Sequence, residues 1–212
     1  MRIGRTAAII ALSIPVALVA GCSSSGHGSL AASPSTRAAI DENAAFNAAD
    51  VTFAQKMIPH HQQAIEMAAL VPDRSTSPDL RTLALQITAA QAPEIEMMSM
   101  WLRDWGHEVP SDTDTSMSGH GASAMAGMAG MDGSDGMMDM AQMAQLQAAS
   151  GTEFDRLWLE MMIRHHEGAL RMAQTEIADG KSPDAIALAR AIIAGQQAEI
   201  DMMNSMLAPS AN

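Results

Sequence analysis

The sequence predicts an all-α protein, a four-helix bundle made from two copies of one helical hairpin. Its composition favours helices, because only 3% of the 212 residues are aromatic and none is Tyr, whereas 20 are Met. Residues 50–102 also align with residues 155–207 without a gap, at a constant offset of 105 residues. Within each copy, apolar residues recur at helical spacing.

The N-terminal segment, residues 1–21, is typical of a lipoprotein signal peptide. Arg2 and Arg5 precede an apolar run over residues 7–20, which is shorter than the ~20 apolar residues of a membrane-spanning helix. The run ends in Ala20-Gly21-Cys22, which resembles a bacterial lipobox. We therefore expect Cys22, the single cysteine, to carry a lipid anchor on the extracytoplasmic side of a bacterial membrane. The alternative is an ordinary signal peptide followed by a free thiol.

The remaining chain divides into four parts. Residues 22–37 are rich in Ser, Gly, Ala and Pro and predict a flexible tether. Residues 38–105 form the first hairpin, residues 106–143 a partly disordered linker, and residues 144–208 the second hairpin. Neither hairpin can bury its wide apolar face alone, so we expect the two to form one bundle about a pseudo-twofold axis.

Each copy predicts a helix, a turn and a second helix. In the first helix a histidine doublet, His60-His61 or His165-His166, interrupts two adjacent apolar seams. The second helix begins at Ser77-Pro78, repeated in the other copy, because Ser is a good N-cap and Pro fits the first turn. Pro59 inside the first helix is expected to kink it beside His60.

The repeated doublets indicate a metal site. A buried imidazole must be hydrogen-bonded or bound to something, because leaving it unsatisfied costs about 1–3 kcal/mol. Neutral imidazole is the commonest metal ligand and thioether sulfur selects Cu(I). Met57 lies one helical turn before the doublet, and Glu94 or Gln91 on the facing helix could bind the metal or orient an imidazole. The candidate ligands in the bundle are His60, His61, His165, His166, Met57, Met162, Met67, Met172, Glu94, Glu199, Met98 and Met203.

Structural interpretations of the same residues stay open. The histidines could be hydrogen-bonded core residues, and methionines in a seam are often core filler, including Met97 and Met202. Glu94 and Glu199 could instead pair with arginines such as Arg171.

The linker carries regularly spaced methionines that packing does not require. Its Gly-rich part cannot build a core, although a short helix is plausible from about residue 137 to 149. We therefore predict capture of a soft metal by the linker through Met125, Met128, Met131, Met137, Met138 and His120. Thioethers do not titrate, so this metal should persist in mild acid. Metal held by imidazole should be lost as histidine protonates near its reference pKa of about 6.5.

Net charge restricts the partners. The formal charge is −12, which argues against nucleic acid and anionic membrane surfaces as partners. The expected partners are a metal ion and, through the lipid, a membrane. The sequence does not indicate a protein partner.

These residues also carry a family resemblance. The segments 53–68 and 154–173, each with a Met-Ile-x-His-His signature, and the segments 91–102 and 196–207 look like the twin signatures of a bacterial envelope family known as domain of unknown function number 305. The resemblance implies a ferritin-like four-helix fold and, for some members, periplasmic copper binding.

The leading hypothesis is a lipid-anchored protein of the cell envelope that binds copper, with Cu(I) favoured, and buffers or delivers it without acting as an enzyme. One alternative is a dimetal enzyme of the ferritin-like type, whose sites use Glu-x-x-His. Here the residues three positions before each histidine are Met57, Ile58, Met162 and Ile163. Another alternative is a structural or ligand-binding envelope bundle without metal.

The lipid anchor gives a first prediction. The Cys22→Ala variant should be released in soluble form or accumulate as an uncleaved precursor, because the acylated residue is missing. Membrane fractionation with immunoblotting measures both outcomes. Unchanged processing and membrane retention would contradict the assignment.

Overall fold

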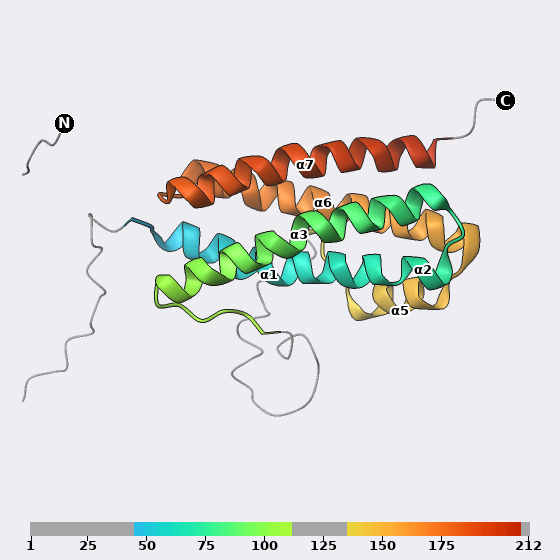
Figure 1. Cartoon of the computed structure of the whole chain (residues 1–212), viewed down its shortest axis with the longest axis horizontal. Helices are drawn as coiled ribbons and strands as arrows, with labels where there is room; N and C mark the ends of the chain where they lie inside the picture. Colours follow the sequence, from blue (N-terminus) through green and yellow to red (C-terminus); the bar gives the residue numbers. More distant parts are fainter. Residues whose placement is uncertain (1–44, 112–134, 209–212) are drawn as a thin grey trace, which may run out of the picture. The chain divides into compact units, whose positions relative to one another are not determined.

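The chain folds into the all-α four-helix bundle that the repeat predicts (Figure 1). This computed structural model describes residues 45–111 and 135–208, which all belong to one compact unit, Asp41–Asn212. The signal peptide, Cys22, the tether, His120 and the linker methionines up to Met131 lie outside the described residues. The long helices are α1 (Ala48–Ala69), α3 (Pro78–Asp104), α6 (Gly151–Asp179) and α7 (Pro183–Leu207); the short ones are α2 (Val71–Arg74) and α5 (Met140–Ala148).

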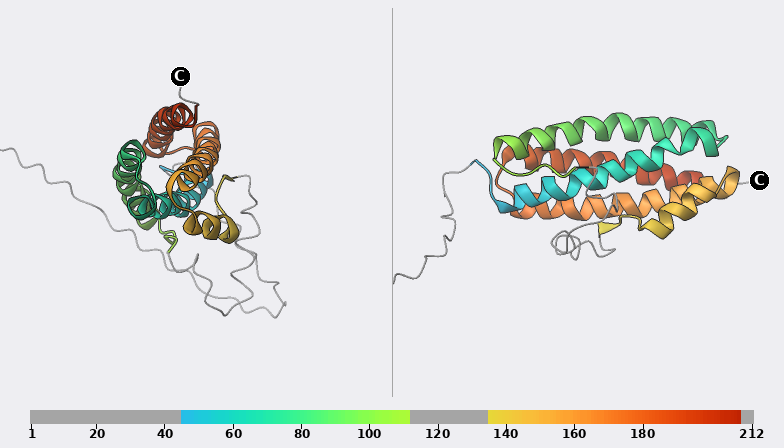
Figure 2. Two further views of the ribbon diagram at one scale, coloured as in Figure 1. Left: turned by 90° about the vertical axis from the view of Figure 1, so that its right-hand side faces the viewer. Right: turned by 90° about the horizontal axis from the view of Figure 1, so that it is seen from below.

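The two sequence copies form two antiparallel hairpins, α1 with α3 and α6 with α7. The hairpins meet mainly through α1 and α6, which run in opposite directions, while α3 and α7 touch each other much less. In the end-on view of Figure 2 the four long helices surround a common interior, and α5 lies outside them against α6. Among the described helices, none is both long enough and apolar enough to cross a membrane.

Local sequence sets the helix boundaries as expected. The side chains of Ser77 and Ser182 accept the backbone N–H of Leu80 and Ala185, and a proline follows each serine as the first residue of α3 and α7. Asn47 caps α1 in a capping box with Asp50. Pro59 lies inside α1, and Pro93, which the sequence analysis did not single out, lies inside α3.

The hydrophobic core is divided into two halves. Along α1, one cluster of buried residues ends at Ile58 and the other begins at Ala64. Along α6 the order is reversed: the cluster that contains Ala64 ends at Met162, and the cluster that contains Ile58 begins at Ala169. Both histidine doublets fall in these gaps and are themselves buried. The histidines therefore form a polar belt across the middle of an apolar bundle.

Asp50 ties the two hairpins together at one end of the bundle. Its carboxylate is fully buried and accepts backbone N–H groups from Asn47, Lys181 and Ser182 at 2.6, 3.1 and 2.8 Å. The equivalent residue in the second copy, Asp155, is only partly buried, and its buried Oδ1 atom has no hydrogen-bond partner among the described residues.

Asp50→Ala should therefore lower the free energy of unfolding by about 2 kcal/mol or more, because it leaves buried N–H donors unpaired. Urea unfolding followed by circular dichroism measures the change. Asp155→Ala is the matched control and should cost much less. Equal losses in both variants would contradict a specific role for Asp50.

Candidate metal centre

The centre of the belt is a pair of stacked imidazoles from the two hairpins. The rings of His60 on α1 and His165 on α6 lie with their centroids 3.7 Å apart and their planes at 36°. Each ring is 6.4 Å from its neighbour in the doublet, His61 or His166, at 54° in both copies. The equal geometry places the pseudo-twofold axis between His60 and His165. All four imidazoles thus lie buried in the bundle interior, in contact with one another as pairs.

The outer two imidazoles are oriented by glutamates on the partner helices. His61 Nε2 lies 2.7 Å from Oε2 of Glu94, and His166 Nε2 lies 2.7 Å from Oε2 of Glu199. A carboxylate only accepts, so Nε2 carries the proton and Nδ1 keeps a lone pair. Each glutamate is therefore placed to orient its histidine, one of the two roles expected for Glu94.

Buried thioethers lie one helical turn from each of these pairs. Met57 precedes His61 by four residues and Met98 follows Glu94 by four, so the antiparallel hairpin brings both to the same level. The two methionines belong to the same apolar cluster and are fully buried. The second copy repeats the arrangement with Met162 and Met203.

Residues 135–138, which lead from the linker toward α5, form a strap that covers His60. The ring donates from Nε2 to the backbone oxygen of Asp135, at 2.9 Å, and this bond again leaves the lone pair on Nδ1. Gly136 has a φ of +79°, and at Gly168 in α6 a side chain would collide with the backbone of Asp135. The close approach of strap and helix therefore depends on glycine. The contact between the strap and α6 was not predicted from the sequence, although Gly168 inside the expected helix was a usable signal.

Gln63 fixes the other end of the strap. It donates to the backbone oxygen of Met138 at 2.8 Å and accepts the Met138 N–H at 2.7 Å. Met138 itself packs into the core, with Arg164 Nη2 3.9 Å from its sulfur. Met138 was expected in the linker, but the structure makes it part of the bundle, since it is buried in the same apolar cluster as Trp158. Met137 is partly buried beside it.

The belt contains buried polar atoms that the protein does not satisfy. Five imidazole nitrogens have no hydrogen-bond partner among the described residues, and neither do the amide atoms of Gln91 and Gln196. Each such atom costs on the order of 1–3 kcal/mol. The nitrogens are Nδ1 of His60, His61 and His166 and both ring nitrogens of His165. Imidazole lone pairs beside thioethers are a donor set that fits a soft metal ion.

Burial keeps the central pair, His60 and His165, neutral at neutral pH. Burial, with a smaller contribution from the neighbouring His61, lowers the pKa of His60 to about 3. Burial and the adjacent His60 lower the pKa of His165 well below its usual value. The loss of imidazole-bound metal in mild acid stays a prediction, and the low pKa of His60 moves the loss expected at this residue to more acidic pH, because the reference pKa of about 6.5 applies to a solvated histidine.

Two predicted ligands lie apart from the belt. Met67 and Met172 are each seven residues beyond a belt histidine, about 10 Å along the helix. Met67 is buried beneath Trp158, whose Nε1 donates to the Met67 backbone oxygen at 2.9 Å. The structure therefore does not bring these sulfurs to the imidazoles.

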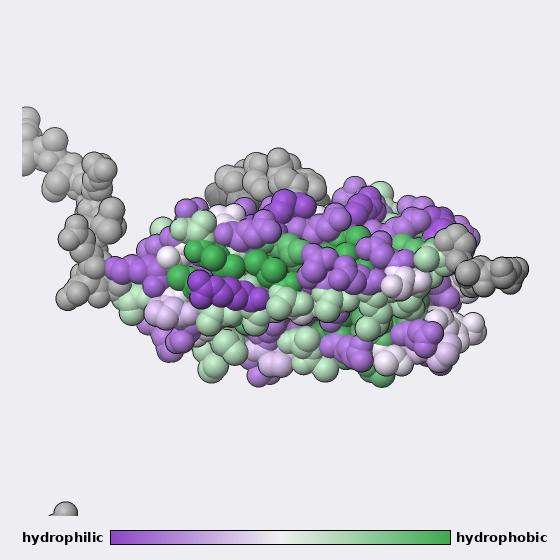
Figure 3. All heavy atoms as spheres, turned by 90° about the horizontal axis from the view of Figure 1, so that it is seen from above, coloured by the Kyte–Doolittle hydropathy of each residue, from purple (hydrophilic) through white to green (hydrophobic). Residues whose placement is uncertain are grey.

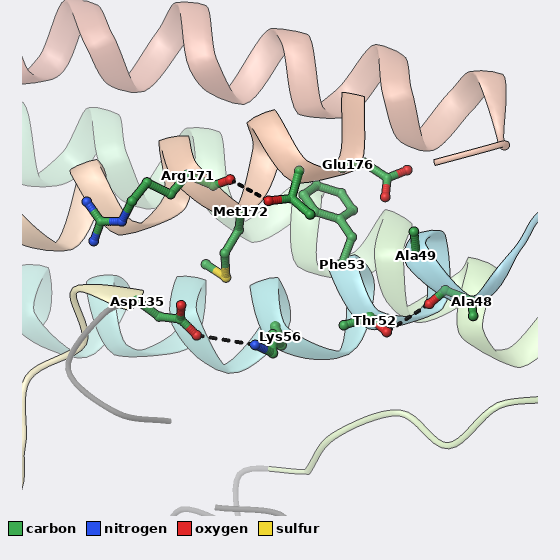
Figure 4. Close-up of a pocket in the computed structure, with 10 residues that line it drawn as sticks. Ala48, Ala49, Thr52, Phe53, Lys56, Asp135, Arg171, Met172 and Glu176 are labelled. Atoms are coloured by element: carbon green, nitrogen blue, oxygen red, sulfur yellow. Dashed lines mark hydrogen bonds and ion pairs between the residues drawn. The ribbon is translucent and has the colours of Figure 1, made fainter. Parts of the chain in front are cut away.

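Met172 instead lines a cavity of about 520 Å³ between α1 and α6, where Phe53 takes the place that Trp158 has in the other copy (Figure 4). Lys56 and Arg171 contribute cationic groups to its wall, and Lys56 pairs with Asp135 at 3.5 Å. Burial, and next the contact with Asp50, raises the pKa of the lining residue Glu176 to about 8, so this carboxyl is protonated at neutral pH. The cavity therefore has little attraction for a metal cation.

Residues 50–207 match the family described as domain of unknown function (DUF305). The chain belongs to the DUF305 family. It is similar to a DUF305 protein from Streptomyces coelicolor described as a candidate secreted protein, with 32% identity and a TM-score of 0.63 over 75% of this chain and 91% of that one. A DUF305 fragment from Deinococcus radiodurans is 30% identical, with a TM-score of 0.61 over 76% and 96% of the two chains.

CopM in its Cu(I)-bound form is also similar, with 30% identity and a TM-score of 0.58 over 74% of this chain and 94% of that one. CopM has further been solved with Cu(II) and with Ag. No curated protein matches the chain. Copper binding therefore occurs in a protein that shares this DUF305 fold.

The low histidine pKa values predict how the metal-free protein responds to acid. Below pH about 6.5 the unfolded chain takes up protons at His60 and His165 that the folded protein excludes, so stability falls by about 1.4 kcal/mol per pH unit for each histidine. The loss continues until the pH approaches the folded pKa, about 3 for His60.

Urea unfolding of metal-free protein between pH 7 and pH 4 measures this slope. The His60→Gln, His165→Gln variant should show a clearly shallower slope, since acidic groups elsewhere are unchanged. Parallel pH profiles for parent and variant would contradict the assignment.

Proposed function

We propose that this DUF305 protein binds copper, with Cu(I) favoured, outside the cytoplasmic membrane and buffers it or hands it on. The observation that carries the proposal is the set of five buried imidazole nitrogens without hydrogen-bond partners, next to buried methionines. The similarity to CopM, solved with Cu(I), Cu(II) and Ag, supports the same metal class.

The donor types favour a soft metal. Glu94 and Glu199 hold Nε2 of their histidines, so Nδ1 is available as a ligand. Met57 and Met98, or Met162 and Met203, supply thioether sulfur, which prefers Cu(I) to hard cations. The neutral state of His60 means that protons compete weakly for its lone pair at neutral pH.

We propose a binding protein rather than an enzyme. Ferritin-like dimetal sites need several carboxylates together with histidine. Among residues 45–111 and 135–208, no three His, Cys, Asp or Glu side chains converge to hold a metal ion. A site in this belt therefore needs methionine among its ligands, which suits capture and release of Cu(I) better than a carboxylate-bridged metal pair.

The cellular setting is part of the proposal. A lipid on Cys22 would hold the bundle at a membrane on its extracytoplasmic side, in keeping with the Streptomyces coelicolor relative. Met125, Met128, Met131 and His120 of the linker would add a second set of donors for Cu(I). The linker joins the bundle at the strap that covers His60.

Paired substitutions test the belt. His60→Ala with His61→Ala should weaken Cu(I) binding, and His165→Ala with His166→Ala should do so comparably, because the copies are equivalent. The Glu94→Gln substitution should lower the Cu(I) affinity by about 10- to 100-fold, as expected for a residue that orients a ligand. Competition against a Cu(I) chelator at pH 7 measures each affinity.

Methionine substitutions provide the matched control. Met57→Leu with Met162→Leu should lower Cu(I) affinity, whereas Met67→Leu with Met172→Leu should not, because those sulfurs lie two turns from the imidazoles. If all of these variants bind copper like the parent, the belt histidines are structural.

A further inference from the structure

Two methionines at equivalent positions point outward rather than into the core. Met97 on α3 is 37% exposed and Met202 on α7 is 46% exposed, although the periodicity of each helix had left them as possible core residues. The side of the bundle where α7 lies carries a band of apolar residues between polar margins (Figure 3). Packing does not explain why both copies place a thioether at this exposed position.

These methionines lie next to Glu94 and Glu199, which contact the belt histidines and also reach the surface. Met97 follows Glu94 by three residues and Met202 follows Glu199 by three, so each pair shares a helix face. The two glutamate side chains are 19% and 17% exposed, while His61 and His166, which they hold, are fully buried. Each glutamate therefore connects an exposed thioether to a buried imidazole.

The charge of this region favours a cation. Around Met97, α3 carries Glu94 and Glu96 and has no basic residue between positions 82 and 102. Around Met202, α7 carries Glu199 and Asp201 and has no basic residue after Arg190. Acidic surfaces concentrate cations and speed their arrival. The cavity beside Met172 has the opposite character, because Lys56 and Arg171 line it.

We propose that Met97 and Met202 are uptake sites, where a soft monovalent metal ion binds first and from which it passes to the His61–Glu94 and His166–Glu199 pairs. This inference rests on the proposed copper function and adds the route by which the buried belt is loaded. The thioether binds the incoming ion, the partly exposed carboxylate attracts it, and the next residue along each helix, Met98 or Met203, offers buried sulfur.

The test is the rate of metal uptake by the full chain. Met97→Leu with Met202→Leu removes both thioethers but keeps helix propensity and apolar volume. Stopped-flow transfer of Ag(I) or Cu(I) from a weak chelator should become several-fold slower, with the final number of bound ions unchanged. Circular dichroism verifies that the bundle is intact.

Met100→Leu is the matched control. Met100 is 54% exposed on the same helix, but the equivalent residue in the other copy is Ser205, and it is not within one turn of Glu94. This variant should load at the parent's rate. An unchanged rate in the double variant, or an equal slowing in Met100→Leu, would overturn the proposal.

A second readout follows the sulfur atoms directly. Two equivalents of Ag(I), added together with a brief peroxide pulse, should lower the oxidation of Met97 and Met202 more than that of Met100, as measured by mass spectrometry. Protection of Met100 alone would overturn the assignment. A parent protein that takes up no metal would refute the proposed copper function, whereas normal uptake that is insensitive to Met97 and Met202 would refute only the uptake sites.

Discussion

Everything at the centre of this bundle follows from placing histidine on a pseudo-twofold axis. A residue on such an axis meets its own copy, and here the buried imidazoles of His60 and His165 stack with their ring centroids 3.7 Å apart. Both rings are held neutral by burial, since two adjacent imidazolium ions would repel each other without solvent. The pair divides the hydrophobic core into two halves and leaves ring nitrogens without partners. The middle of the bundle therefore contains imidazole nitrogens where the two ends contain packed apolar side chains.

The two copies have diverged around this shared centre. Gln63 and Gly168 are equivalent positions, yet Gln63 holds the strap by hydrogen bonds and Gly168 makes room for it. As a result the strap supplies a backbone oxygen, that of Asp135, to His60 and none to His165. The outer pairs, His61 with Glu94 and His166 with Glu199, remain equal at 2.7 Å. A symmetric set of histidines and glutamates is thus combined with an asymmetric cover over the central pair.

Much of the fold could be predicted from the sequence, because the repeat fixed the hairpins and local chemistry fixed their ends, as at Ser77 and Ser182. The His–Glu pairing was within reach, since Glu94 interrupts an apolar seam opposite the doublet. The stacking of His60 on His165 could not be predicted, because the apolar periodicity does not say which seam of each helix faces the other hairpin. The strap was missed because its key contact is a backbone oxygen, and Met172 was misplaced because one seam spans several turns. The apolar seams did indicate that the histidines are buried, but the expected pKa of about 6.5 left out the effect of that burial, which lowers the pKa of His60 and His165.

The most direct test of the central claim is X-ray absorption spectroscopy at the copper edge, on untagged protein loaded with Cu(I). The comparison is between the parent and a variant with leucine at the linker positions Met125, Met128 and Met131. Copper bound in the belt should show both nitrogen and sulfur neighbours in the two proteins, because His61, His166 and the buried methionines are intact in each. Sulfur-only coordination in the parent, or loss of all copper from the linker variant, would contradict a metal centre in the bundle.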